Sequence, residues 1–166
     1  MMMNKLILLF SAVFLALTVR GQALPSDGWT ENTPKTGTVN AAPEQLTMRS
    51  LDNKLGACAY HKRMPGKPGQ IYKLTVRAAG QGTLEAGLYL YATDNRFLGR
   101  VPYPMKAVAV NSETPQEIIY YLEIPAGDNG GKGEAAFFRP CLRTPKGETR
   151  VSEAALEEVK EIPRPV

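Results

Sequence analysis

The stretch GQIYKLTVRAAGQGTLEAGLYLYA, residues 69–92, decides the fold of this chain. It holds two alternating segments, 72–78 and 84–91, joined by a glycine-rich connection. Alternation with a period of two is typical of strands that turn one face toward a core. The residues in the core phase are Tyr72, Leu74, Val76 and Ala78 in the first segment and Leu84, Ala86, Leu88 and Leu90 in the second. The other face of the second segment carries Tyr89 and Tyr91, and tyrosines there are either sheet padding or a binding surface.

Residues 1–23 are expected to be a signal peptide. A short basic start precedes the apolar run 6–19, which is too short to span a bilayer comfortably and has the length of a signal-peptide core. The small residues Gly21 and Ala23 place the cleavage site near Ala23. We therefore expect an exported protein, secreted, periplasmic or at the cell surface, with no membrane insertion after cleavage.

Length and charge bound the remaining possibilities. The 166-residue chain carries 20 basic and 16 acidic residues, and two of the basic residues lie in the expected signal peptide. The mature chain would therefore be close to neutral, and no basic patch clusters along it, so nucleic-acid binding is not expected. The rest fits a single domain with its own core. We expect a lead-in segment at 24–42, a β-domain at 43–160 and a tail at 161–166.

Turn residues divide the β-domain into eight predicted strands. They are residues 44–50, 56–64, 72–78, 84–91, 106–111, 117–124, 134–144 and 151–160. The last segment also has high helix propensity, and a C-terminal helix is the alternative. Short strands at this spacing predict an all-β fold, a two-sheet antiparallel β-sandwich, and eight strands are the number of a jelly roll.

The jelly-roll order predicts which strands are neighbours. One sheet would run 44–50, 151–160, 72–78, 117–124, and the other 56–64, 134–144, 84–91, 106–111. This order places Cys58 and Cys141 on adjacent strands. Because an exported protein meets an oxidising environment, a disulfide between them is expected, and two buried thiols are the alternative.

Four runs resemble the secreted galactose-binding-like jelly rolls, above all the carbohydrate-binding modules of families 4 and 9. They are PGKPGQIYKLTVRAAGQG, LYLYATDNRFLG, TPQEIIYYLEIP and AAFFRPCLRTPKGETRVSEAALEEV. The resemblance covers about residues 29–160 and implies a non-catalytic module that binds a glycan. Two places depart from the pattern. Gln116-Glu117 stands where such modules often have Trp, and Ser152-Glu153 stands where an Asp pair often helps to hold a structural calcium ion. With one acid kept and one replaced, no cofactor is expected, and a structural calcium ion is the alternative.

The outward phase of the second predicted sheet forms the candidate binding platform. Its residues are Tyr60, Tyr89, Tyr91, Phe137 and Arg139. Sugar C–H groups pack on aromatic faces, and arginine and tyrosine form hydrogen bonds with hydroxyls. A glycan or polysaccharide is therefore the first predicted partner. Cross-strand aromatic pairs also stabilise sheets without binding anything. The alternative is therefore a structural or adhesion module of the cell envelope, with a protein as its partner.

Catalysis and metal binding are not expected. His61 is the only histidine and is assigned to the core phase, so neither a histidine-based nucleophile nor a zinc site can be assembled. Glu157 and Glu158 are adjacent on a predicted strand and face opposite ways, whereas a glycosidase needs two converging carboxylates. The loop DNGGKG at 128–133 lacks the spaced acids of a calcium loop.

Overall fold

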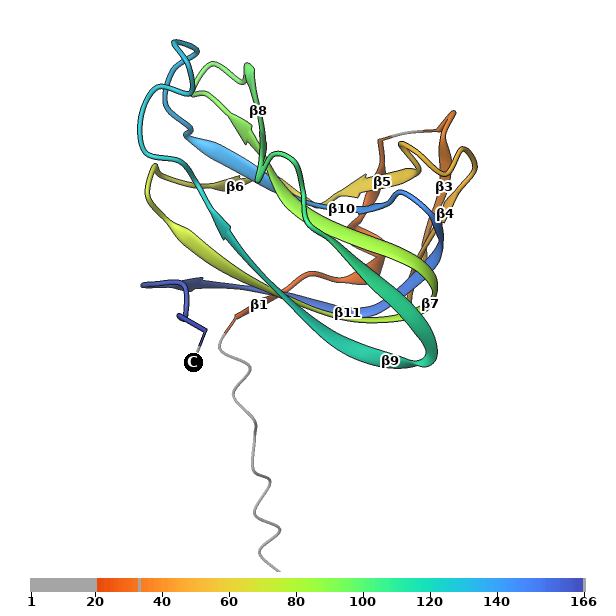
Figure 1. The fold of residues 1–166 in the computed structure, drawn as a ribbon. Helices are drawn as coiled ribbons and strands as arrows, with labels where there is room; N and C mark the ends of the chain where they lie inside the picture. Colours follow the sequence, from red (N-terminus) through yellow and green to blue (C-terminus); the bar gives the residue numbers. More distant parts are fainter. Residues whose placement is uncertain (1–20, 33, 166) are drawn as a thin grey trace, which may run out of the picture.

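The described part of the chain folds into one strongly bent antiparallel sheet of 11 strands, whose two halves pack as a sandwich (Figure 1). The computed structural model describes residues 21–32 and 34–165. The strands are β1 (Gln22–Ala23), β2 (Thr30–Glu31), β3 (Gly37–Ala41), β4 (Leu46–Ser50), β5 (Ala57–Tyr60), β6 (Met64–Pro65), β7 (Ile71–Tyr91), β8 (Phe97–Val101), β9 (Ala107–Glu123), β10 (Phe137–Thr144) and β11 (Gly147–Val159), and a short 3-10 helix η1 spans Ser26–Gly28. All of the predicted signal peptide except residues 21–23 lies outside the described residues.

The opening stretch forms one strand, β7, where the sequence predicted two. β7 continues through the glycine-rich connection, which pairs with both β9 and β11. Two features mark the bend: the register to β9 shifts between Ala78 and Gly80, and Gly80 has a φ of 130°. A Cβ at Gly80 would lie 2.4 Å from the carbonyl oxygen of Glu148. The prediction of a break was wrong because these glycines keep the ladder while letting the partner backbone approach closely.

β9 repeats this behaviour on the other side of β7. The predicted strands 106–111 and 117–124, with a turn at 112–115, are instead a single strand that bends together with β7. Figure 1 shows β7 and β9 as two long ribbons that run side by side through the bend. Each of these strands therefore belongs to both layers of the sandwich.

The predicted jelly-roll neighbours are confirmed. β4 pairs with β11, β11 with the first half of β7, and that half with the second half of β9. In the other layer, β5 pairs with β10, β10 with the second half of β7, and that half with the first half of β9. β11 is a strand and not a helix because it fills the position between β4 and β7. The prediction missed β3, which pairs with β4, and β8, which pairs with β7.

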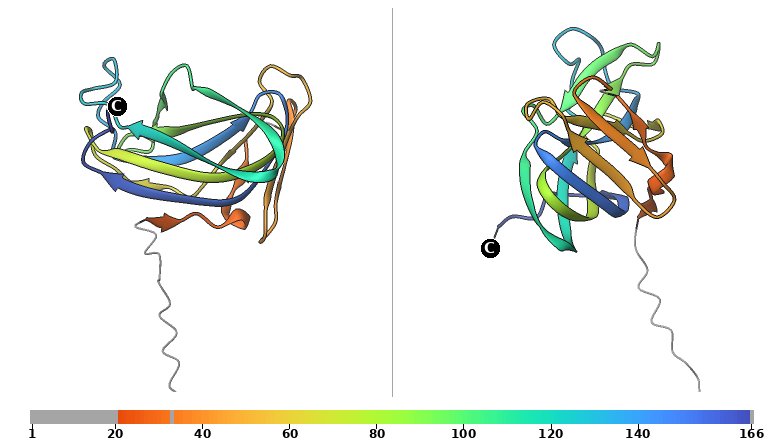
Figure 2. Two further views of the ribbon diagram at one scale, coloured as in Figure 1. Left: turned by 60° about the horizontal axis from the view of Figure 1, so that its bottom comes forward. Right: turned by 90° about the vertical axis from the view of Figure 1, so that its right-hand side faces the viewer.

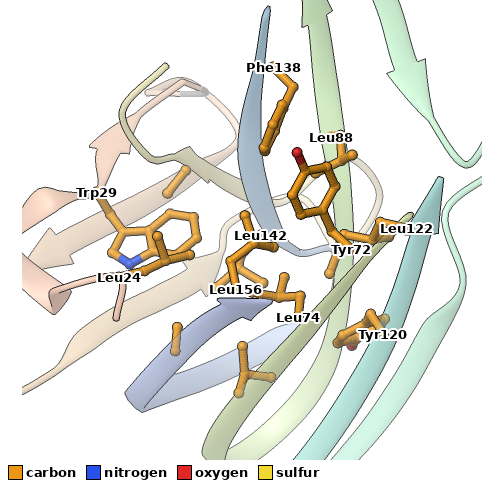
Figure 3. Packing of buried hydrophobic residues seen from close by; sticks show 14 of the residues in the cluster. Leu24, Trp29, Tyr72, Leu74, Leu88, Tyr120, Leu122, Phe138, Leu142 and Leu156 are labelled. Atoms are coloured by element: carbon orange, nitrogen blue, oxygen red, sulfur yellow. The ribbon is translucent and has the colours of Figure 1, made fainter. Parts of the chain in front are cut away.

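The core lies between the two layers and uses the predicted phase. Leu74, Val76, Leu84 and Leu88 of β7 are fully buried. The core side chains come from both layers and from the N-terminal segment, and Figure 3 shows Leu24 and Trp29 beside Leu142 and Leu156. No helix in the described part of the chain has the length and hydropathy needed to cross a bilayer.

The segment before β2 is held against the sandwich by Trp29 and His61. The Trp29 ring is buried and meets the His61 ring edge-on, with the centroids 5.1 Å apart. The His61 Nε2 atom lies 3.3 Å from the carbonyl oxygen of Pro25, and the Leu24 amide donates to the Ala154 carbonyl of β11 at 2.8 Å. Figure 2 shows this segment running beneath the sandwich. The N-terminal segment therefore completes the core at one edge.

The bend of β7 gives a first prediction. We expect Gly80→Ala to lower the free energy of unfolding by about 2–4 kcal/mol, because it combines an unfavourable φ with a backbone collision. Gly99→Ala is the matched control, since Gly99 has a φ of 133° but open space around its Cβ position. It should cost only about 1–2 kcal/mol. Urea denaturation measures both, and equal losses would contradict the role of the close approach.

His61 gives a second prediction. Burial is the main cause that lowers the pKa of His61 below its ordinary value. The unfolded chain therefore binds a proton that the folded chain resists, and stability is lost as the pH falls below about 6.5. His61→Gln keeps a donor for the Pro25 carbonyl without the titration, so its unfolding free energy should fall less between pH 7 and pH 5. If the unfolding free energies of the wild type and of His61→Gln fall by the same amount between pH 7 and pH 5, this assignment is wrong.

Candidate ligand-binding cleft

The outer face of β10, β7 and β8 carries two rows of aromatic and basic side chains. Arg139 lies opposite Tyr89, and Tyr89 lies opposite Arg100. One step along, Phe137 lies opposite Tyr91, which lies opposite Phe97. Residues directly opposite in antiparallel strands point to the same face. The pairing thus brings side chains from three separate parts of the chain onto one surface.

A cleft of about 720 Å³ opens on this face. Its lining residues are Asn32, Tyr60, Tyr89, Tyr91, Phe97, Gly99, Arg100, Tyr103 and Arg139. The structure therefore brings together four of the five residues of the predicted platform. Phe137 lies outside the cleft, where the guanidinium carbon of Arg63 stands 4.3 Å from its ring centroid.

Tyr89 forms the floor of the cleft and is not an exposed platform residue. It faces away from the main core, as predicted, but only 8% of its surface is exposed. Its hydroxyl accepts a hydrogen bond from Asn32 Nδ2 at 3.1 Å and lies 3.0 Å from Cys58 Sγ, so the side chain extends across β10 toward β5. Burial, with the neighbouring cysteines, raises the pKa of Tyr89 above its ordinary value. The phenol therefore stays protonated, with its hydroxyl occupied inside the protein.

The exposed aromatic rings come from residues outside the predicted platform. Phe97 is 56% exposed and Tyr103 is 79% exposed. The Phe97 ring centroid lies 5.7 Å from that of Tyr89, edge-on, and 5.7 Å from that of Tyr91. Phe97 and Arg100 both line the cleft although they are three residues apart, because the register of β8 shifts between Leu90 and Tyr91. An alternation pattern with period two cannot detect such a pair.

Two arginines stand on the cleft rings. The Arg139 guanidinium carbon lies 4.7 Å from the centroid of Tyr60 and 5.9 Å from that of Tyr91. The Arg100 guanidinium carbon lies 5.4 Å from the centroid of Tyr103. Cation–π contacts of this kind hold a guanidinium in place while leaving N–H donors at the ring edge. The cleft therefore offers fixed hydrogen-bond donors beside aromatic surfaces.

Beside the cleft, Met105 covers another part of the same face. Met105 is buried against Cys58, Tyr89 and Cys141 and forms a small second core on the outer side of the sheet. A Cβ at Gly87 would lie 2.8 Å from the Met105 sulfur, so Gly87 makes room for this contact. One part of the outer face is thus padding, and the other part is an open cleft.

Cys58 and Cys141 lie on the adjacent strands β5 and β10, as predicted, but the structure does not join them in a disulfide. The register explains this outcome. Cys58 is opposite Arg143 and Cys141 is opposite Tyr60, so the two cysteines are diagonal neighbours. Diagonal positions are separated by about 7–8 Å, whereas disulfides usually join Cα atoms about 4.4–6.8 Å apart. Burial raises the pKa of the Cys141 thiol, which makes it a poor nucleophile.

The described residues form no group of three or more His, Cys, Asp or Glu side chains that could hold a metal ion. Ser152 lies at the irregularity of β11 between Val151 and Glu153, and its hydroxyl donates to the Arg77 carbonyl at 3.4 Å.

Glu85, on the outer face of β7, is bound to Arg143 of β10 with an N–O distance of 2.6 Å. This ion pair is largely buried and lies below the cleft, so the Glu85 carboxylate is occupied.

No family model matches this chain, and no curated protein matches its sequence. Solved structures with a similar fold include three carbohydrate-binding modules. The xylan-binding CBM22-1 domain of Paenibacillus barcinonensis Xyn10C aligns with a TM-score of 0.55 at 10% identity, over 86% of this chain and 97% of that one. BiXyn10A CBM1 in the apo form gives 0.53 at 10% identity over 84% and 98%, and a CBM4 module gives 0.52 at 9% identity over 85% and 93%. The jelly-roll fold of carbohydrate-binding modules is therefore confirmed.

The hydroxyl of Tyr89 gives a third prediction. Tyr89→Phe removes the partner of Asn32 Nδ2 and of Cys58 Sγ, and we expect it to lower the free energy of unfolding by about 1 kcal/mol. Tyr91→Phe is the control, because the Tyr91 hydroxyl forms no hydrogen bond to a described residue, and it should leave stability unchanged. Urea denaturation compares the two, and an unchanged midpoint for Tyr89→Phe would refute the structural role of its hydroxyl.

Proposed function

We propose that this protein is an exported, non-catalytic module that binds a glycan chain in the cleft of β5, β10, β7 and β8. The observation that carries the proposal is the cleft itself, in which the exposed rings of Phe97 and Tyr103 stand beside the guanidinium groups of Arg139 and Arg100. The xylan-binding domain of similar fold supports a polysaccharide as the class of ligand.

The chemistry of the cleft suits a sugar ring. The C–H face of a pyranose packs against an aromatic face, and the hydroxyls at the ring edge need donors and acceptors in the same plane. Phe97 supplies an exposed aromatic surface, and the side chains of Arg139 and Asn32 supply polar groups elsewhere in the lining. Because Tyr89 and Cys141 are packed beneath, the cleft floor is fixed before the ligand arrives. A preformed site loses little entropy on binding.

The same lining supports binding without hydrolysis. Asp, Glu and His are absent from the residues that line the cleft in the described part of the chain. Glycoside hydrolysis needs a pair of carboxylates, one of them as a general acid. The nearby Glu85 is largely buried and held by Arg143. The module would therefore bind a glycan without hydrolysing it.

A structural or adhesion module of the cell envelope is the second candidate. The covered part of the outer face, where Met105 packs on Cys58, Tyr89 and Cys141, favours it, because these aromatic and sulfur side chains stabilise the sheet without a ligand. The two candidates differ in what the open part of the face binds.

Binding to soluble polysaccharides provides the fourth prediction. In affinity electrophoresis against a panel that includes xylan, we expect Phe97→Ala and Tyr91→Ala each to weaken binding by about threefold to tenfold, since each removes an aromatic contact. Tyr121→Ala is the matched control, because Tyr121 is a partly exposed tyrosine of β9 that pairs with Lys73, away from the cleft. It should bind like the wild type.

Circular dichroism and urea denaturation check that the three variants remain folded. The glycan proposal fails if the wild type binds none of the polysaccharides. It also fails if Tyr121→Ala weakens binding as much as Phe97→Ala does. The structural candidate then gains support.

A further inference from the structure

The cleft has an uncompensated positive charge. Its lining includes Arg100 and Arg139 and, among the described residues, no aspartate or glutamate. The ion pairs of the described chain involve Arg96, Arg143 and Arg150, and neither cleft arginine has a carboxylate oxygen within 4.0 Å. Arg96, Arg143 and Arg150 are each held by a carboxylate, whereas Arg100 and Arg139 meet the cleft without one.

The two arginines are placed symmetrically about the cleft floor. Arg139 of β10 and Arg100 of β8 are both directly opposite Tyr89 of β7, so the three residues form one row across three strands. Neighbouring strands lie about 4.8 Å apart, which separates the two arginine backbones by about 10 Å. Tyr89 is too buried and too occupied by its own hydrogen bonds to compete for ligand groups between them. A ligand that lies over Tyr89 therefore meets a cation on each side.

Both guanidinium groups lie over aromatic rings. Arg139 packs over Tyr60 and donates through one Nη atom to the His61 carbonyl at 3.5 Å, which leaves its other N–H groups for a ligand. Arg100 packs over Tyr103, the most exposed aromatic ring of the cleft. Stacked guanidinium groups present a planar pair of N–H donors that matches a carboxylate or a sulfate in two-pronged geometry. A neutral sugar hydroxyl accepts from only one of these two N–H donors.

We infer that the ligand of this cleft is an acidic glycan, one that carries carboxylate or sulfate groups along its chain. The inference rests on the proposed glycan-binding function and narrows it. Arg139 and Arg100 bind the acidic groups from the two sides, while Phe97 and Tyr91 contact the sugar rings between them. The absence of acidic residues from the lining removes the repulsion that an anionic chain would otherwise meet.

The test uses pairs of polymers that differ only in charge. Polygalacturonate is compared with its methyl ester, and dextran sulfate with dextran, by isothermal titration calorimetry on the full folded module. We expect at least one charged polymer to bind about tenfold or more tightly than its neutral partner, the range of hydrogen bonds to charged groups. Raising the salt concentration should weaken that binding. Preference for polygalacturonate identifies a carboxylated ligand, and preference for dextran sulfate identifies a sulfated one.

Arg139→Gln and Arg100→Gln should each lower affinity for the charged polymer by about tenfold and lower affinity for the neutral partner by a smaller factor. Arg77→Gln is the matched control, because it removes the same charge from an exposed position of β7 on the other layer. An equal loss in Arg77→Gln would mean that only the net charge of the protein attracts the polymer, and the inference would be overturned.

The failure of this inference can be told apart from failure of the proposed function. If charged and neutral partners bind equally and both arginine variants bind like the wild type, while Phe97→Ala weakens binding, the glycan function stands and the acidic ligand is refuted. If none of these polymers nor xylan binds, both are refuted.

Discussion

The structure depends on the pairing of β7 with β9 on both sides of the bend at Gly80, where the register shifts. A sandwich usually turns its chain at loops, which leave strand ends to be capped or covered. Here glycine allows the ladder to continue around the corner, because the β11 backbone at Glu148 occupies the space of a side chain. Both layers therefore share two strands, and the positions of β10 and β11 on either half of β7 follow from that one bend.

The candidate site is a consequence of the same arrangement. The second half of β7 is flanked by β10 on one side and β8 on the other, so its outward residues gain neighbours from distant segments. Small residues at Gly87 and Cys141 leave room beneath Tyr89 and Met105, which pack there as a second, smaller core. This padding fixes the floor of the cleft and turns the exposed rings and the two arginines toward solvent at its rim.

Much of this architecture could be predicted from local patterns. The alternation in β7 identified Leu74 and Leu88 as core residues, and both are fully buried. The phases assigned to β5, β7 and β10 also placed Tyr60, Tyr91 and Arg139 on the outer face, where they line the cleft. Phe97, Arg100 and Tyr103 could not be found in this way. Phe97 and Arg100 share a face only because of a register shift, and Tyr103 lies in an irregular segment whose path depends on the packing of Met105.

The sequence by itself determined the all-β class and the buried face of each long strand, because side-chain alternation is a local property of the chain. Together with the jelly-roll order, these strands also gave the neighbours in each sheet. Only the tertiary structure decided which outward residues are exposed, whether β7 bends or breaks, and how the cysteines are aligned. These features depend on register and on contacts between distant segments, and a shift of two residues separates Cys58 from the position opposite Cys141. Register and contacts between distant segments also bury Tyr89 in the floor of the cleft and leave Phe97 exposed at its surface.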